Sequence, residues 1–153
     1  MTEDPAIQDR LFPDVRCFGC GPANEDGLRI KSYPASDLVV TARFTPWPQH
    51  DNGVGFLNGG IIATLLDCHS GAAAFHHAEL RGWGPLPGAA FAYVTAGINV
   101  RYLRPAPLDA TVDLVAEVRE ASEDQMSVGV RLEHDGKVRA EADALWKRWR
   151  PRA

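Results

Sequence analysis

The residue whose type and position most clearly suggest chemistry is Asp67, in the middle of the apolar segment IIATLLDCHSGAAAF (61–75). Burying an unpaired carboxylate costs free energy, so a carboxylate kept there is either a satisfied structural hydrogen-bonding group or a functional group with a shifted pKa. If the segment is a helix, Gly60, Thr64 and Gly71 share the face of Asp67. These small residues leave room for a ligand, or for close packing of the helix on a sheet.

The tripeptide Asn58-Gly59-Gly60 immediately precedes this segment and ends a glycine-rich loop. The first backbone N–H groups of a helix have no partner within the helix and lie at the positive end of its dipole. They can therefore bind an oxyanion, such as a carbonyl oxygen that gains negative charge during a reaction. Asn58 is also a favourable N-cap residue, so an ordinary helix cap explains the same three residues.

The spacing between Gly59 and Asp67 limits how the two can cooperate. Eight residues correspond to about 12 Å along a helix, and one carbonyl group cannot contact both positions. If both residues serve one reaction, they come from different subunits, in two sites related by a two-fold axis. We therefore expect a homodimer or a homotetramer.

One long helix and six strands are expected to position these residues. The helix is predicted over residues 60–80, and because it is apolar nearly all round it should be buried on most sides. Alternation of apolar and polar residues predicts strands over residues 28–33, 37–44, 90–105, 110–120, 126–134 and 137–149. The pair Asp135-Gly136 predicts a two-residue hairpin turn between the last two strands.

The order of these elements predicts the α+β class, with three of the last four strands in an antiparallel meander. A flat sheet can cover only one face of a helix that is apolar all round, so we expect a strongly curled antiparallel sheet. Residues 1–27 are rich in Asp, Pro and Gly and are expected to form an irregular lead-in with one short helical turn. Residues 28–153 are expected to form the domain.

Composition narrows the functional classes. The 153 residues carry a formal net charge of −4, which gives the chain as a whole no attraction to nucleic acid or to an anionic membrane. The sequence MTEDPAIQDR does not resemble a secretion signal, and no apolar run approaches the ~20 residues that span a bilayer. We expect a cytoplasmic protein with neither a nucleic-acid nor a membrane partner.

The three cysteines do not predict a disulfide framework, because their number is odd. Cys17 and Cys20 form a single C-x2-C pair, without the second pair of ligands that a zinc site needs, and the five histidines are not at ligand spacing. Packing of small thiols in a turn is therefore favoured over a metal or redox role, and no metal is expected.

Two motifs together carry a resemblance to a known family. The first consists of Asn52, Gly55, the Asn58-Gly59-Gly60 tripeptide and Asp67, and the second is TAGINVRYLRP (95–105). Together they resemble the PaaI-like branch of the hot-dog thioesterase superfamily, over about residues 28 to 147. The resemblance implies a hot-dog fold, in which a curled sheet wraps a central helix, and hydrolysis of an acyl-CoA thioester. Coenzyme A would be part of the substrate, and no other cofactor is implied.

The same resemblance implies roles for individual residues. Asp67 matches the catalytic acidic residue of the helix, acting as nucleophile or as general base toward water. Gly59 matches the glycine whose N–H polarises the thioester carbonyl. Asn52 matches an asparagine that orients the water or the thioester, and Thr95 a hydroxyl residue that positions the attacking water. Asn58 and Gly60 would complete the substrate-binding helix start.

Two departures from the family pattern bear on function. Asn58 stands where related enzymes usually have histidine, and it can form hydrogen bonds but cannot carry a proton at neutral pH. Gly97 stands where an aspartate is common. A non-catalytic acyl-CoA or lipid-binding protein is therefore an alternative, and an enoyl-CoA hydratase is a weaker one because its Asp and His motif is absent.

Further residues have two interpretations each. Arg101 and Arg104 could contact the phosphates of coenzyme A, or could simply be solvated charges at a strand end. His69 points to a different helix face from Asp67, which is typical of a core or interface histidine. A final set of aromatic residues could line an acyl tunnel or pack in the core: Trp47, Phe56, Phe75 and Trp83.

Overall fold

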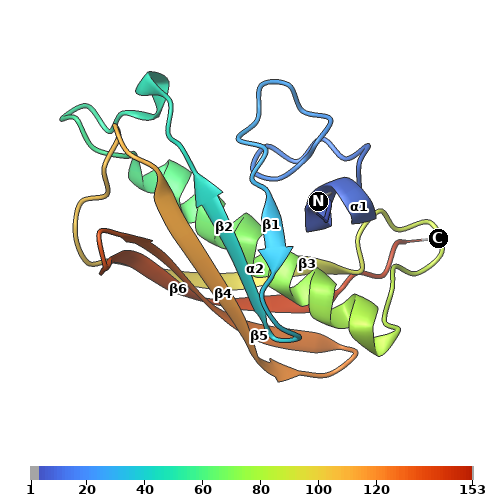
Figure 1. The fold of residues 1–153 in the computed structure, drawn as a ribbon. Helices are drawn as coiled ribbons and strands as arrows, with labels where there is room; N and C mark the ends of the chain where they lie inside the picture. Colours follow the sequence, from blue (N-terminus) through green and yellow to red (C-terminus); the bar gives the residue numbers. More distant parts are fainter. Residues whose placement is uncertain (1–3, 153) are drawn as a thin grey trace.

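The computed structural model describes residues 4–152, which form one long helix, two short helical segments and six strands. In chain order these are α1 (Ile7–Leu11), β1 (Ser32–Pro34), β2 (Val39–Phe44), the 3-10 helix η1 (Pro48–His50), α2 (Gly59–Arg81), β3 (Tyr93–Tyr102), β4 (Val112–Ala121), β5 (Gln125–His134) and β6 (Lys137–Arg148). Figure 1 shows α2 crossing the concave side of the sheet. No helix within residues 4–152 has the length and apolar character required to cross a membrane.

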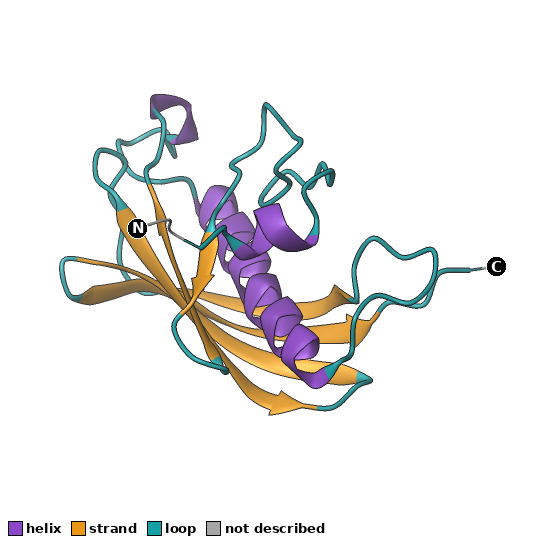
Figure 2. Cartoon of the chain, turned by 45° about the vertical axis from the view of Figure 1, so that its right-hand side comes forward, coloured by secondary structure: helices purple, strands orange, loops and turns teal. Residues whose placement is uncertain are grey.

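The six strands form one antiparallel sheet in the order β1-β2-β4-β5-β6-β3. Strands β4, β5 and β6 are consecutive neighbours, which confirms the predicted meander. Figure 2 shows the sheet curling around α2 without closing into a barrel. The α+β class and the hot-dog arrangement are therefore confirmed, and β3 lies at one edge of the sheet.

Helix α2 begins and ends close to its predicted limits for identifiable reasons. The Asn58 side-chain oxygen accepts hydrogen bonds from the backbone N–H groups of Gly60 (2.8 Å) and Ile61 (3.1 Å), so Asn58 is the N-cap. At the other end Gly82 has a φ of 75°, the left-handed conformation that terminates helices and that glycine adopts without strain.

The helix packs very closely on β6, and a glycine makes this possible. A Cβ atom added at Gly71 would lie 2.6 Å from the Trp146 ring. The Trp146 ring nitrogen donates to Ser70 Oγ over 2.9 Å, and this hydroxyl donates to the Asp67 backbone carbonyl over 2.7 Å. A β6 side chain is therefore linked to the helical turn that carries Asp67.

The predicted strand over residues 28–33 is wrong for its first four residues, because β1 begins only at Ser32. Arg29 has a φ of 49°, which is incompatible with extended backbone. Leu28 and Ile30 are nonetheless buried. The alternation in the sequence thus reflected which side chains enter the core, and not a strand.

The predicted hairpin between β5 and β6 is confirmed. Asp135 and Gly136 have φ values of 54° and 72°, the positive values that both central residues of a type I′ turn require. This turn aligns β6 against β5 and β3, with Thr95 and Trp146 as register partners.

Residues 4–27 of the N-terminal lead-in pack against the same core as the sheet and α2. They contain the expected short helix α1, and three of their side chains, Ile7, Phe12 and Cys20, belong to the common hydrophobic cluster. In Figure 2 this segment lies on the side of α2 opposite the sheet. The lead-in therefore covers the part of the helix that the open sheet leaves uncovered.

His69 is a core residue, which is one of the two roles, core or interface, that the sequence predicted for it. Its Nδ1 lies 2.9 Å from Ser32 Oγ and its Nε2 lies 3.0 Å from the Val40 carbonyl, so it joins α2 to β1 and β2. The side chain is fully buried, and burial lowers its pKa from 6.5 to about 4. The imidazole is therefore neutral in the folded protein at neutral pH.

The burial of His69 predicts that the folded protein loses stability as the pH falls. Because the unfolded chain binds the proton below about pH 6.5 and the folded chain does not, stability should fall as the pH drops from 6.5 toward 4, by about 3 kcal/mol in total. Urea unfolding at several pH values should show that His69→Gln removes this slope. Ser32→Ala, which loses a hydrogen bond but keeps the imidazole, should be less stable than the parent at every pH and retain the slope. Identical slopes for the parent and His69→Gln would contradict the assignment.

Candidate active site

Asp67 lies on α2 opposite the start of β3, where its carboxylate has one fixed partner. The Thr95 hydroxyl donates to Asp67 Oδ1 over 2.7 Å. The structure thus brings together two of the residues selected from the sequence, although 28 positions separate them. The carboxylate is half-buried. Its second oxygen has no hydrogen-bond partner among the described residues, so it is available to a ligand.

The surroundings of Asp67 favour its protonated form. Burial is the main cause that raises its pKa above 3.8, the nearby Cys17 adds to this, and the Thr95 hydrogen bond opposes both. A carboxylate with a raised pKa beside a pocket is typical of a group that accepts or donates a proton in a reaction.

The pocket beside Asp67 has a volume of about 320 Å³ and an uneven distribution of polar groups. Sulfur and oxygen atoms gather at the Asp67 end, and aromatic rings line the rest. The lining residues are Cys17, Cys20, Asp67, Cys68, Phe75, Phe91, Tyr93, Val94, Thr95 and Trp146.

Two of these rings also line a second, apolar pocket of about 270 Å³ at the end of α2. Phe75 and Phe91 line both pockets and stack on each other with ring centroids 5.4 Å apart. Leu11 and Phe12 of the lead-in also line the apolar pocket, and the Phe12 ring packs edge-on against both Phe75 and Phe91. Of the four aromatic residues proposed for an acyl tunnel, Phe75 is the one at the Asp67 pocket.

The start of α2 forms a separate site. Gly60 and Ile61 donate their N–H groups to the Asn58 cap, so they are satisfied. Within residues 4–152, the Gly59 N–H has no hydrogen-bond acceptor. A single N–H at the positive end of a 23-residue helix is therefore free to bind an oxyanion.

A pocket of about 480 Å³ lies at this helix start, and Asn52, Phe56, Gly59 and Arg104 are among its lining residues. The Asn52 side-chain oxygen accepts from the N–H groups of Val54 (2.9 Å) and Phe56 (3.2 Å), which folds the loop before the helix. The amide nitrogen of Asn52 makes no bond within the described residues. The side chain thus shapes the loop and keeps a donor for a ligand.

The selected residues therefore separate into two groups at different positions on one helix. Gly59, Asn52 and Arg104 are at the N-terminus of α2, and Asp67 and Thr95 are two turns further along. Continuous helix between Gly59 and Asp67 keeps them about 12 Å apart.

Arg101 does not join either group. Its guanidinium pairs with Glu141 and Asp143 of β6, each at 3.2 Å, on a polar surface of the sheet that neither pocket includes. Two carboxylates neutralise this charge. Of the two arginines that could contact coenzyme A, the structure places only Arg104 at the helix start.

Two features of the site are absent from the sequence prediction. Tyr102, the last residue of β3, donates its hydroxyl to the Gly59 carbonyl over 2.7 Å and so lies across the helix start. Cys68 brings a third thiol to the C-x2-C pair of the lead-in, with the three sulfur atoms within 4.8 Å of one another. The second feature was hidden because Cys68 is 48 positions from Cys20.

Comparison with known proteins gives a consistent assignment. The family model described as "Thioesterase superfamily" matches residues 54–141. The acyl-coenzyme A thioesterase THEM4 of Xenopus laevis is 28% identical over 128 residues, which are 80% of this chain and 52% of that protein. The chain thus spans about half the length of that relative.

Solved structures share the fold. A thioesterase superfamily protein from Shewanella loihica PV-4 is 29% identical with a TM-score of 0.62, over 79% of this chain and 91% of that one. The PaaI protein of E. coli has a TM-score of 0.67 at 20% identity, over 80% of each chain.

The raised pKa of Asp67 predicts that this residue costs stability at neutral pH. A folded-state pKa above the unfolded value means that stability is full below pH 3.8 and is lost as the pH rises through the folded value. Asp67→Asn, which can still accept from Thr95, should therefore raise the Tm at pH 7 by a few degrees and lose this advantage near pH 3.8. Asp113→Asn, at an exposed carboxylate paired with Arg43, is the matched control and should give no gain. A lower Tm for Asp67→Asn at pH 7 would contradict the raised pKa.

Proposed function

Because the chain belongs to the thioesterase superfamily, we propose that it hydrolyses an acyl-CoA thioester to a carboxylic acid and free coenzyme A. The observation that carries the proposal is the Asp67 carboxylate, half-buried in a pocket, held by the Thr95 hydroxyl and free at its second oxygen. The relative from Xenopus laevis, named as an acyl-coenzyme A thioesterase, supports the same class of substrate.

In the proposed reaction Asp67 initiates attack on the thioester carbonyl carbon. It acts either as a general base that takes a proton from water or as a nucleophile whose acyl intermediate water then hydrolyses. In both routes the C–S bond breaks, water supplies the new oxygen of the acid, and the departing thiolate takes up the proton. Thr95 fixes one carboxylate oxygen, which aims the other at the substrate.

The carbonyl oxygen gains negative charge during the attack and needs a donor. We assign this role to the Gly59 N–H, which is unbonded within the described residues and is at the positive end of α2. To the Asn52 amide, which lines the same pocket, we assign the role of orienting the thioester or the water.

Since one carbonyl cannot reach both Gly59 and Asp67 of the same helix, we propose that each active site combines the helix start of one subunit with the Asp67 pocket of its partner. Strand β3 supports this arrangement. It pairs with β6 along one side only, and it carries exposed apolar side chains, Ile98 and Tyr102, at the free edge of the sheet. Pairing of two β3 strands would join two sheets and yield a homodimer, from which a homotetramer could assemble.

The two pockets suggest where the parts of the substrate bind. Arg104, whose guanidinium also donates to the Val138 carbonyl, offers a positive charge to the phosphates of coenzyme A at the helix start. The acyl group would extend from Asp67 along the stacked Phe75 and Phe91 rings toward the apolar pocket. The reaction as proposed uses no cofactor besides the coenzyme A of the substrate.

One observation favours a second candidate, a non-catalytic acyl-CoA-binding protein. The Asn58 side-chain oxygen accepts two hydrogen bonds as the cap of α2, so it is not a free acceptor for the substrate. The side chain also cannot transfer a proton to the substrate. Binding without turnover of an acyl-CoA panel would favour this alternative.

The catalytic role of Asp67 predicts the effect of removing its charge. Asp67→Asn should lower kcat by about 10² or more on every substrate that the parent hydrolyses, the usual contribution of a general base. Release of free thiol from short, medium, long and aromatic acyl-CoAs measures this rate. Thr95→Ser, which preserves the hydroxyl, is the matched control and should stay within a few-fold of the parent. An Asp67→Asn protein as fast as the parent would refute the assignment.

The edge pairing of β3 predicts that a charge in this strand separates the subunits and abolishes activity. We expect the parent to be a dimer or tetramer by light scattering, and Ile98→Asp to be a folded, inactive monomer. Leu38→Asp places the same charge at an exposed apolar residue outside the edge and should leave the assembly and the rate unchanged. An active monomer would contradict the composite site.

A further inference from the structure

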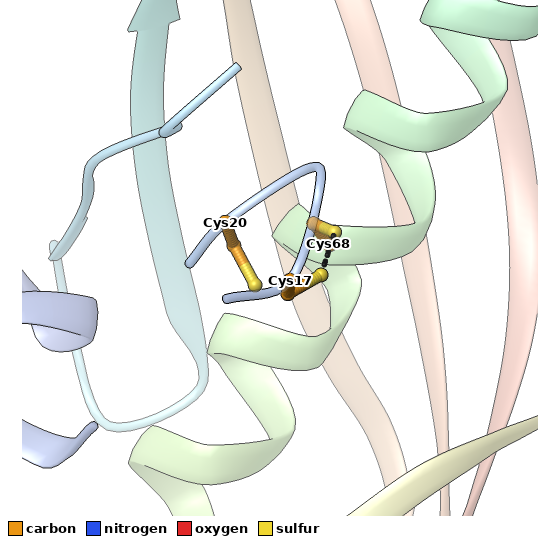
Figure 3. Close-up of side chains that lie close together, drawn as sticks. All are labelled: Cys17, Cys20 and Cys68. Atoms are coloured by element: carbon orange, nitrogen blue, oxygen red, sulfur yellow. Dashed lines mark hydrogen bonds between the residues drawn. The ribbon is translucent and has the colours of Figure 1, made fainter. Parts of the chain in front are cut away.

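Three thiols from two distant parts of the chain converge beside α2. Cys17 and Cys20 belong to the lead-in loop, and Cys68 belongs to the helix. Figure 3 shows the three side chains directed toward one another. Cys17 Sγ and Cys68 Sγ are 3.7 Å apart, and all three sulfur atoms lie within 4.8 Å of one another. Cys20 and Cys68 are buried and Cys17 is half-buried.

The distance between the sulfur atoms fits joint coordination of one metal ion better than it fits a disulfide bond. Zn–S bonds of about 2.3 Å at tetrahedral angles place two sulfur ligands about 3.8 Å apart. A disulfide needs about 2.05 Å between its sulfur atoms, much less than the 3.7 Å between Cys17 and Cys68. A modest adjustment of Cys20 would bring all three sulfur atoms to one tetrahedral centre.

Two glycines of the lead-in allow this loop to pack very closely on helix α2. A Cβ atom at Gly19 would lie 2.3 Å from Cys68 Sγ, and one at Gly21 would lie 2.3 Å from the Cys17 nitrogen. The Gly21 N–H also donates to the Cys17 carbonyl over 2.8 Å, which closes the turn. Only glycine allows the approach at either position, so the proximity of the three thiols is built into the local sequence C-x-G-C-G.

Binding of a divalent metal ion would change the protonation of the three cysteines. Zinc is bound by thiolates and not by thiols, so the ion would replace the thiol protons of the cluster.

We propose that Cys17, Cys20 and Cys68 form a binding site for a thiophilic metal ion, Zn²⁺ bound by three thiolates. Within residues 4–152 no further His, Cys, Asp or Glu atom joins the cluster, so a water molecule from the adjoining pocket supplies the fourth ligand. This inference departs from the sequence expectation of no metal, because the third ligand is contributed by α2. The ion would fix the lead-in to α2 one residue from Asp67.

The direct test measures metal in the full-length protein purified under reducing conditions. We expect one Zn²⁺ per chain by elemental analysis. Replacement with Co²⁺ should give the thiolate-to-cobalt charge-transfer absorption of a tetrahedral sulfur site. Cys17→Ser, Cys20→Ser and Cys68→Ser should each lower metal affinity by at least about tenfold, the smallest loss usual even for a residue that only supports a metal ligand. His134→Gln, at a potential ligand outside the cluster, should leave metal content unchanged.

A second measurement needs no variant and so remains decisive if a serine variant fails to fold. Zn²⁺ added to the metal-free parent should protect all three thiols from alkylation, as mass spectrometry of the cysteine peptides can show. Equal alkylation with and without Zn²⁺, together with less than about one-tenth of a metal ion per chain, would overturn the proposal. A Cys17–Cys68 disulfide that forms in air at the same rate with and without Zn²⁺ would overturn it in favour of a redox pair. Neither readout depends on thioesterase activity.

Discussion

A single helix carries both halves of the proposed chemistry, and this constraint governs the rest of the structure. Helix α2 must present a free N–H at Gly59 and a carboxylate at Asp67, and its rigidity keeps them about 12 Å apart. Most of the other α2 residues as far as Ala78 are apolar and buried, so the helix needs cover on nearly every side. The curled sheet supplies most of that cover, and the N-terminal lead-in supplies the rest. Because the sheet is open, β3 is left at an edge where a second subunit can complete the site.

Much of this could be predicted because it depends on local patterns. The length of α2 follows from an apolar run bounded by an asparagine cap and a glycine, and the β5–β6 turn follows from Asp135-Gly136. Asp67 could be recognised as a functional candidate because burying a carboxylate in an apolar helix costs free energy. The family and the fold that these motifs suggested are confirmed.

The features that could not be predicted depend on long-range geometry. Leu28 and Ile30 alternate like strand residues, yet Arg29 turns the backbone, since burial alone selects their side chains. The neutralisation of Arg101 depends on β6 partners brought alongside by the sheet register. The third thiol of the Cys17 and Cys20 pair comes from a helix that is remote in sequence and adjacent in space. In each case the sequence shows which groups are present, and the tertiary pairing determines their partners.

The most direct test of the composite active site is complementation between two inactive variants. Asp67→Asn removes the carboxylate, and Asn52→Asp removes the amide donor at the helix start while keeping the oxygen that folds its loop. In a heterodimer with sites shared between subunits, one site has both lesions and the other has neither. Subunit exchange between the two variants should therefore restore up to about half of the parent activity per heterodimer. Heterodimers that form by mass spectrometry and remain inactive would show that each site lies within one chain.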